Sequence, residues 1–152
     1  MTGWEILAAI GAATGVPALI WQVYAQVHTW NAGKPSIRVT AANGFPVYRG
    51  GGAGNHHFTV TATNHGGTAA TVTSWGFRLP DRLGNLVLFE EHPFSDRLPA
   101  AVAPQTAVTF YADGRDVIER CQERGVKARQ VRPFVLLATG LEVLGNPLPW
   151  KD

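Results

Sequence analysis

Two patterns of hydrophobic and polar positions divide the chain. Residues 6–21 form a run of sixteen positions without a charge, in which bulky and small side chains recur at helical spacing. After residue 35 the period changes to two, and Phe58, Val60 and Ala62 alternate with polar neighbours, as in a strand with one buried face. The pattern predicts an N-terminal helix over 1–31, a hinge over 32–35 and a β domain over 36–152.

The β domain is expected to contain about seven short strands. Period-two patterning and turn residues predict strands at 37–41, 57–63, 70–79, 86–89, 106–110, 131–139 and 141–144, with a loop over 93–104. Asp113 and Gly125 bracket one helix as N-cap and C-terminal stop. These elements predict a mainly β, immunoglobulin-like sandwich of two sheets with one short helix. Its expected core comprises Phe58, Val60, Val108, Phe110, Phe134 and Leu136.

The N-terminal run is long enough to cross a bilayer. Residues 3–24 would span about 33 Å as a helix, and Trp4, Trp21 and Tyr24 stand where interfacial aromatic residues are expected. A single-pass membrane helix is therefore predicted. Two alternatives remain open, a helix that packs on protein and a cleaved signal peptide, although no Lys or Arg precedes the run as a signal peptide requires.

Orientation follows from the cations and the cysteine. Lys34, Arg38 and Arg49 follow the apolar run and no cation precedes it, so the positive-inside rule places the C-terminal domain in the cytoplasm. Cys121 is alone in the chain. It can form no intrachain disulfide, which agrees with a reducing compartment.

One side of the predicted helix consists of small residues. Gly11, Gly15, Ala18 and Gln22 recur at spacings of three and four, and a GxxxG pair lets two helices approach closely in lipid. The pattern predicts a homo-oligomer formed through this side. The alternative is that a segment rich in alanine and glycine contains the motif by chance.

Composition and charge exclude several classes of protein. The chain has 152 residues, 17 of them glycine and 10 proline, and only 16% are charged, which excludes a coiled coil and a long-helix bundle. The formal net charge is +2 and the positive residues are scattered among acidic ones. A nucleic acid partner is therefore not expected.

Few residues point to chemistry. His56 and His57 are adjacent, so on a strand they face opposite ways, and His65 lies at the other end of that strand. The Glu90-Glu91-His92 run lies at a strand end, where solvated charge is the ordinary interpretation. Cys121 is expected to be a buried, inert thiol on the inner face of the helix. No catalytic residue, metal ligand or cofactor is therefore predicted.

One stretch carries a family resemblance. The run from Phe58 through Asn64-His-Gly-Gly to Trp75 and Leu79 resembles a set of uncharacterised small bacterial proteins, as does the later pattern around Phe110, Phe134 and Gly140. In those proteins an N-terminal membrane helix precedes an immunoglobulin-like domain. The resemblance implies the same architecture here and implies no activity.

The sequence thus predicts a membrane-anchored, non-enzymatic interaction or self-assembly module, such as a bacterial defence or phage-linked membrane protein. Its partners would be the membrane, further copies of the chain, and an unknown protein bound at loops or an edge strand. The alternative is a soluble binding domain for a glycan or for a virion or protein surface, whose N-terminal helix packs on protein. Trp75 or Trp150 would then contact the ligand.

Overall fold

The computed structural model describes residues 20–26, 33–47, 49, 54–87 and 92–150. The chain divides into two compact units, Met1–Lys34 and Pro35–Asp152. In the first unit residues 20–26 are helical, inside the range predicted for the N-terminal helix. No helix among the residues that the structure describes has both the length and the apolar character needed to cross a membrane.

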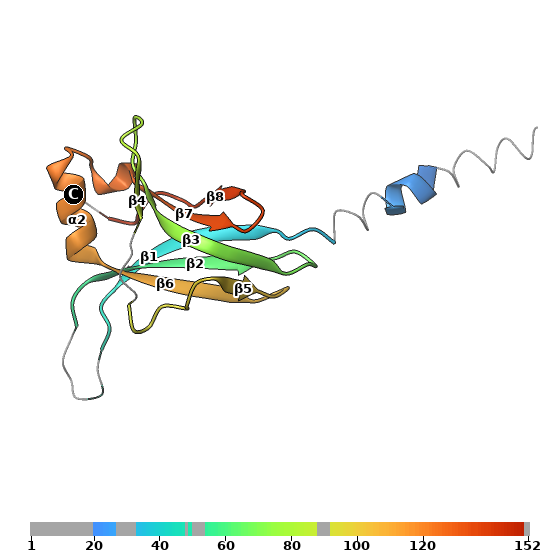
Figure 1. Cartoon of the computed structure of the whole chain (residues 1–152), viewed down its shortest axis with the longest axis horizontal. Helices are drawn as coiled ribbons and strands as arrows, with labels where there is room; N and C mark the ends of the chain where they lie inside the picture. The colour runs from blue at the N-terminus through green and yellow to red at the C-terminus, as the bar shows by residue number, and fades with distance from the viewer. Residues whose placement is uncertain (1–19, 27–32, 48, 50–53, 88–91, 151–152) are drawn as a thin grey trace, which may run out of the picture. The chain divides into compact units, whose positions relative to one another are not determined.

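The second unit is mainly β and contains two antiparallel sheets arranged like a sandwich (Figure 1). The three-stranded sheet has the order β1-β2-β6, and the five-stranded sheet has the order β4-β3-β7-β8, with β5 paired to β3. Their bounds are β1 Ile37–Gly44, β2 His57–Asn64, β3 Ala70–Arg78, β4 Asn85–Val87, β5 Ala100–Val102, β6 Ala107–Asp113, β7 Arg132–Leu137 and β8 Glu142–Leu144.

The predicted helix is confirmed as α2 (Gly114–Glu123). It follows β6 directly. The Asp113 side chain, at the end of β6, accepts a hydrogen bond of 2.8 Å from the Arg115 amide and so caps the first turn of the helix. After Glu123 the chain leaves the helix through Gly125, whose φ of 65° is the left-handed conformation that glycine adopts readily. A short 3-10 turn, η1 (Ala128–Gln130), precedes β7.

The core lies between the two sheets. Phe58, Val60 and Phe110 are fully buried on the three-stranded sheet, and Val108 is also part of the core cluster. Across the sandwich, Trp75 stacks on Phe110 with ring centroids 5.2 Å apart. The predicted burial of the residues on β2 and β6 is therefore confirmed.

On β7 the predicted inward face was wrong. Val135 and Leu137 join the core cluster, whereas Phe134 is buried outside it and Leu136 is partly exposed. Phe134 instead covers Gly76, its register partner on β3, where an added Cβ would meet Phe134 Cε1 at 3.1 Å. Because this strand is apolar on both faces, its pattern contains no alternation that identifies the inner one.

Two further local features differ from the expectation. The pairing of β3 with β7 shifts register between Val72 and Ser74, and this irregularity places Val72 in the same core cluster as Trp75, although strict alternation puts them on opposite faces. Residues 93–104, expected to be a loop, contain β5. This strand has only three residues, Ala-Ala-Val, which is too short for a periodic signal.

A buried asparagine organises the end of the sandwich opposite to α2. Asn64 is fully buried, and its Nδ2 donates hydrogen bonds to the carbonyls of Thr68 (2.8 Å) and Val102 (3.0 Å). Its Oδ1 accepts from the amides of Ser36 (3.2 Å) and Gly66 (2.9 Å). One side chain thus ties the start of β1, the turn between β2 and β3, and β5 together, and its burial is offset by four hydrogen bonds.

Candidate functional site

The residues predicted to act in the N-terminal segment lie mostly outside the described residues. This holds for Trp4, Gly11, Gly15 and Ala18. Within the described helical residues 20–26, Gln22 is exposed, as are Trp21 and Tyr24, with exposed fractions of 71% and 61%. Their rings lie 6.1 Å apart. The membrane-interface and self-association roles of this segment therefore stay predictions.

In the β domain, the two adjacent histidines at the start of β2 face different surroundings. His57 lies at the first position of the strand, and its ring contacts that of His92 with centroids 4.7 Å apart. The His56 ring instead contacts Phe58, two residues further along the strand. The expected opposition of the two side chains is confirmed, and each belongs to a separate cluster at this end of the domain.

His57 and His92 form a continuous chain of hydrogen bonds. Nδ1 of His57 lies 2.6 Å from the carbonyl of Asn55, so it carries the proton and donates. Nδ1 of His92 accepts from the amide of Phe94 at 3.3 Å, which leaves the proton on its Nε2. That Nε2 then donates to Nε2 of His57 at 3.0 Å. All four ring nitrogens are engaged when both imidazoles are neutral.

This chain of hydrogen bonds disfavours protonation of His92. Burial lowers the pKa of His92 below its usual value, the neighbouring His57 lowers it further, and Asp113 opposes the shift. A proton on Nδ1 of His92 would face the amide N–H of Phe94. Sequence reasoning missed this pair because 35 residues separate the two histidines.

The segment that follows His92 covers the outer edge of β6. Asp96 donates its amide to the Thr109 carbonyl (3.0 Å), and its side chain accepts from the Thr109 amide (2.6 Å). Ser95 Oγ accepts from the Tyr111 amide at 2.8 Å. These contacts occupy backbone groups that an incoming strand would need, so β6 is protected against edge-to-edge pairing.

His56 is packed as an aromatic residue. Its ring lies 4.7 Å from those of Phe58 and Trp150 and 5.3 Å from that of Phe45. Both ring nitrogens are buried and have no hydrogen-bond partner among the described residues. Burial therefore lowers its pKa, the nearby His57 lowers it further, and Asp113 opposes the shift. Gly114 has no side chain, and an added Cβ there would collide with the His56 ring.

A surface cavity of about 550 Å³ opens beside this cluster. Phe45, His56 and Trp150 supply its aromatic wall, and residues of α2 such as Arg115 and Glu119 supply polar groups at its rim. We call this feature the aromatic cavity.

The two tryptophans expected to contact a ligand have different places. Trp75 is 5% exposed and belongs to the core, so its proposed role as a surface contact was wrong. It lies on β3 past the register shift, which turns its side chain inward. Trp150 is partly exposed and lines the aromatic cavity.

Other candidate residues are structural. Cys121 is buried in the core cluster, as predicted, and burial raises the pKa of its thiol although Arg124 opposes this. His65 is exposed in the turn after β2. No group of three His, Cys, Asp or Glu side chains within the described part of the chain is placed to hold a metal ion.

Comparison with known proteins assigns neither a family nor a function to the chain. No family model matches the sequence, and the curated proteins contain no significant match to it. The family resemblance of the strand–turn–strand region therefore stays a prediction.

The lowered pKa values of His56 and His92 predict that the stability of the fold decreases at acidic pH. The folded-state pKa values of His56 and His92 lie below their usual value of about 6.5, so the unfolded chain binds more protons once the pH falls below that value. The melting temperature is expected to be highest above about pH 7 and to fall as the pH decreases from about 6.5 through the folded pKa values. Thermal denaturation followed by circular dichroism across this range measures the effect.

Matched variants separate these groups from general acid denaturation. The double variant His56→Phe/His92→Gln is expected to make the melting temperature depend less on pH between about pH 7 and pH 5. His65→Gln changes an exposed histidine of the same domain and should retain the wild-type dependence. An unchanged slope in the double variant would contradict the prediction.

Proposed function

We propose that the chain is a non-enzymatic binding module, held at a membrane by its N-terminal segment, that takes a protein partner at the aromatic cavity. The observation that carries this proposal is the exposure of large aromatic groups around a concave surface. Phe45 is 63% exposed, and it lines the cavity together with Trp150. Aromatic side chains in concave surface sites with a few polar groups are typical of binding sites.

The membrane part of the proposal rests on the sequence. The apolar run over residues 6–21 and the exposed Trp21 and Tyr24 support an anchor, and the division of the chain into two compact units suits a tethered domain. We further propose that the sandwich is immunoglobulin-like, and that the side with Gly11 and Gly15 joins copies of the chain in the membrane.

Trp150 favours glycan binding as a second candidate function. Its partly exposed ring is bordered in the cavity by Asn55, Glu119 and Gln122, and these polar side chains could exchange hydrogen bonds with hydroxyl groups while the indole covers an apolar sugar face. In this case the chain would be a binding domain whose N-terminal helix packs on protein.

Site-specific crosslinking in cells tests the protein-binding function. A photoreactive amino acid in place of Gln122, at the cavity rim, is expected to give a discrete covalent adduct that Phe45→Ser removes. Val47→Ser is the matched control, because Val47 is 78% exposed in the same segment and lies outside the cavity. An adduct of equal yield in the Phe45→Ser variant would contradict the proposal.

The glycan candidate has its own measurement. Tryptophan fluorescence is titrated with oligosaccharides derived from chitin and cellulose, with Trp150→Ala as the comparison. A saturable change in the wild type that the variant lacks would support glycan binding, and an identical response of the two proteins would exclude it at this cavity.

A further inference from the structure

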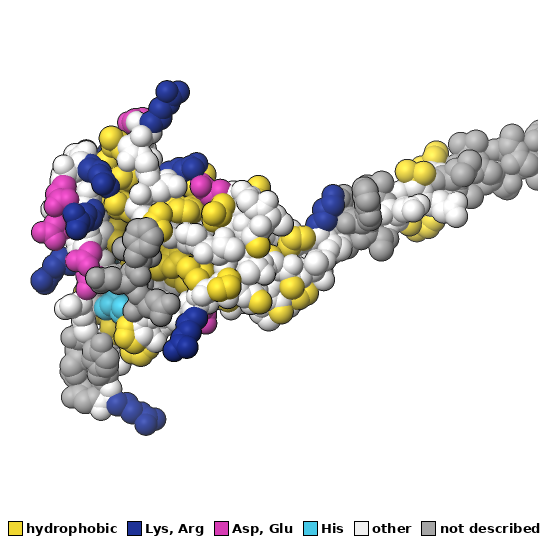
Figure 2. Space-filling model, in the orientation of Figure 1, with side chains coloured by type: hydrophobic (Ala, Val, Ile, Leu, Met, Phe, Trp, Pro, Cys, Tyr) yellow, Lys and Arg dark blue, Asp and Glu magenta, His cyan; other side chains and the backbone are white. Residues whose placement is uncertain are grey.

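A second cavity, of about 750 Å³, lies on the other sheet. It is bordered by the turn between β3 and β4, by residues before and at the start of β7, and by the end of β8. Three of its lining side chains are arginines: Arg78, Arg82 and Arg132. We call it the arginine cleft. Figure 2 shows charged side chains at the tip of the turn between β3 and β4, at the top of the view.

Strand register brings two of these arginines together. Arg78 on β3 is the partner of Arg132 on β7 and of Asn85 on β4. Register partners project from the same face of a sheet, and like charges in directly opposite positions are destabilising. A row of hydrogen-bond donors therefore crosses three strands, and an anion bound between the two arginines would relieve their repulsion.

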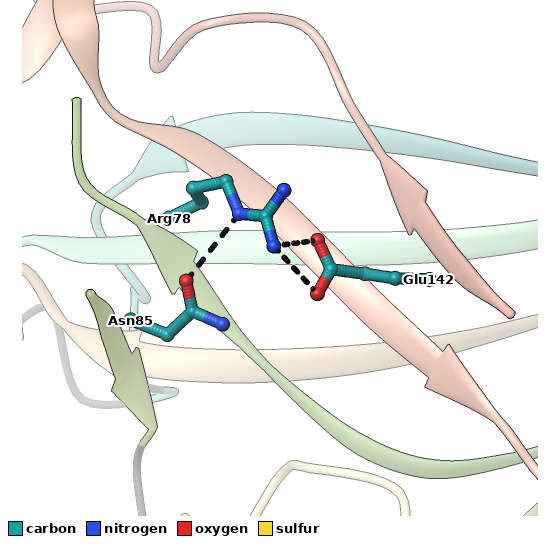
Figure 3. A network of polar contacts seen from close by, with 3 residues as sticks. All are labelled: Arg78, Asn85 and Glu142. Atoms are coloured by element: carbon teal, nitrogen blue, oxygen red, sulfur yellow. Dashed lines mark hydrogen bonds and ion pairs between the residues drawn. The ribbon is translucent and has the colours of Figure 1, made fainter. Parts of the chain in front are cut away.

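The chain neutralises only part of this charge. Nη2 of Arg78 lies 2.8 Å and 3.0 Å from the two carboxylate oxygens of Glu142, and its Nε donates to Asn85 Oδ1 at 3.4 Å (Figure 3). Arg132 donates its Nε to the carbonyl of Gly145 at 2.9 Å. Within the described residues, neither Arg132 nor Arg82 forms an ion pair.

The turn presents Arg82 at the edge of this row. Hydrogen bonds from Leu83 to Pro80 and from Leu79 to Gly84 close the turn. Arg82 has a left-handed φ of 61°, and its exposed guanidinium has no hydrogen-bond partner among the described residues. The intramolecular pair of Arg78 with a carboxylate thus shows the contact that the other two guanidinium groups can offer to a ligand.

We propose that the arginine cleft binds the side-chain carboxylates of an acidic protein segment. A guanidinium group matches the two oxygens of a carboxylate with paired N–H donors. The partly buried Pro80 and Leu144 supply an apolar wall for the rest of the segment. Together with the three arginines, Asp81 within the cleft and Glu142 beside it leave a net positive charge, which favours an anionic ligand. This site is separate from the aromatic cavity and does not depend on the function proposed for it.

Binding of a labelled acidic peptide tests the proposal. The full-length purified chain is titrated into fluorescein-labelled hexaglutamate at low ionic strength, and fluorescence anisotropy is recorded. Binding is expected to weaken as salt is added. The double variant Arg82→Gln/Arg132→Gln should bind about tenfold more weakly. Arg38→Gln/Arg97→Gln removes the same charge from exposed positions outside the cleft and should change the affinity less than about twofold.

Two single substitutions keep the test independent of folding. Arg82→Gln alters an exposed turn residue that makes no ion pair within the described residues, and it should still weaken binding. Glu142→Gln releases Arg78 from its intramolecular carboxylate and should tighten binding. Weaker binding by Glu142→Gln would overturn the proposal.

Further outcomes would also overturn it. One is an equal loss of affinity for hexaglutamate in the cleft double variant and the control double variant. A second is binding of labelled hexalysine as tight as that of hexaglutamate. A third is displacement of hexaglutamate by inorganic phosphate at the same molar concentration. The last result would identify a site for small oxyanions and not for an acidic chain. The same displacement by a short DNA oligonucleotide in place of phosphate would assign the cleft to nucleic acid.

Discussion

Phe110→Ala is expected to remove about 3–5 kcal/mol from the free energy of unfolding, which is a large part of the stability of a domain this size. Phe110 is fully buried. It pairs with Val60 on β2 and stacks on Trp75 of the other sheet with an interplanar angle of 15°. Its removal therefore leaves a cavity at the contact between the sheets. Urea denaturation followed by circular dichroism measures the loss.

Phe94→Ala is the matched control for this prediction. Phe94 is 57% exposed and lies in the segment that covers the edge of β6, so the same change of side chain should cost less than about 1 kcal/mol. Similar losses in the two variants would show that Phe110 does not hold the sheets together.

A chain that lacks residues 1–34 is expected to lose membrane association and to keep its fold. The strands, α2 and the core cluster all lie in the unit Pro35–Asp152, whereas the apolar run over 6–21 lies in the part removed. Fractionation of cells lysed without detergent measures the distribution of both chains, and circular dichroism reports the fold of the shorter one. Full-length protein in the soluble fraction would contradict the membrane anchor.

Gly11→Leu combined with Gly15→Leu separates anchoring from self-association. The double variant makes the segment more hydrophobic, so membrane recovery should persist, while the bulkier side chains should prevent close helix contact. Chemical crosslinking in native membranes is expected to show oligomers for the wild type and for Ile6→Leu/Ile10→Leu, but not for the double glycine variant. Unchanged crosslinking of the glycine variant would leave the motif without a role.

The candidate sites could be predicted only in part. The sequence indicated that His56 and His57 face opposite ways, because neighbouring residues on a strand do so. It did not indicate that His57 meets His92, or that His56 lies between Phe45 and Trp150, because these contacts join segments far apart in the chain. The arginine cleft also joins segments far apart in the chain, since the pairing of β3 with β7 brings Arg78 and Arg132 together.

Local sequence patterns were sufficient to predict some of the secondary-structure elements. Alternation of apolar and polar residues was enough for β2 and β6, where one face is buried and the other is not, and the capping residue Asp113 was enough for the start of α2. The tertiary structure decided what local patterns leave undefined. It selected the inward face of β7, whose residues are apolar on both sides, and it shifted the register of β3 so that Trp75 entered the core. Side-chain periodicity specifies a face only where the two faces differ in polarity, and contacts between distant segments arise only when the sheets pack.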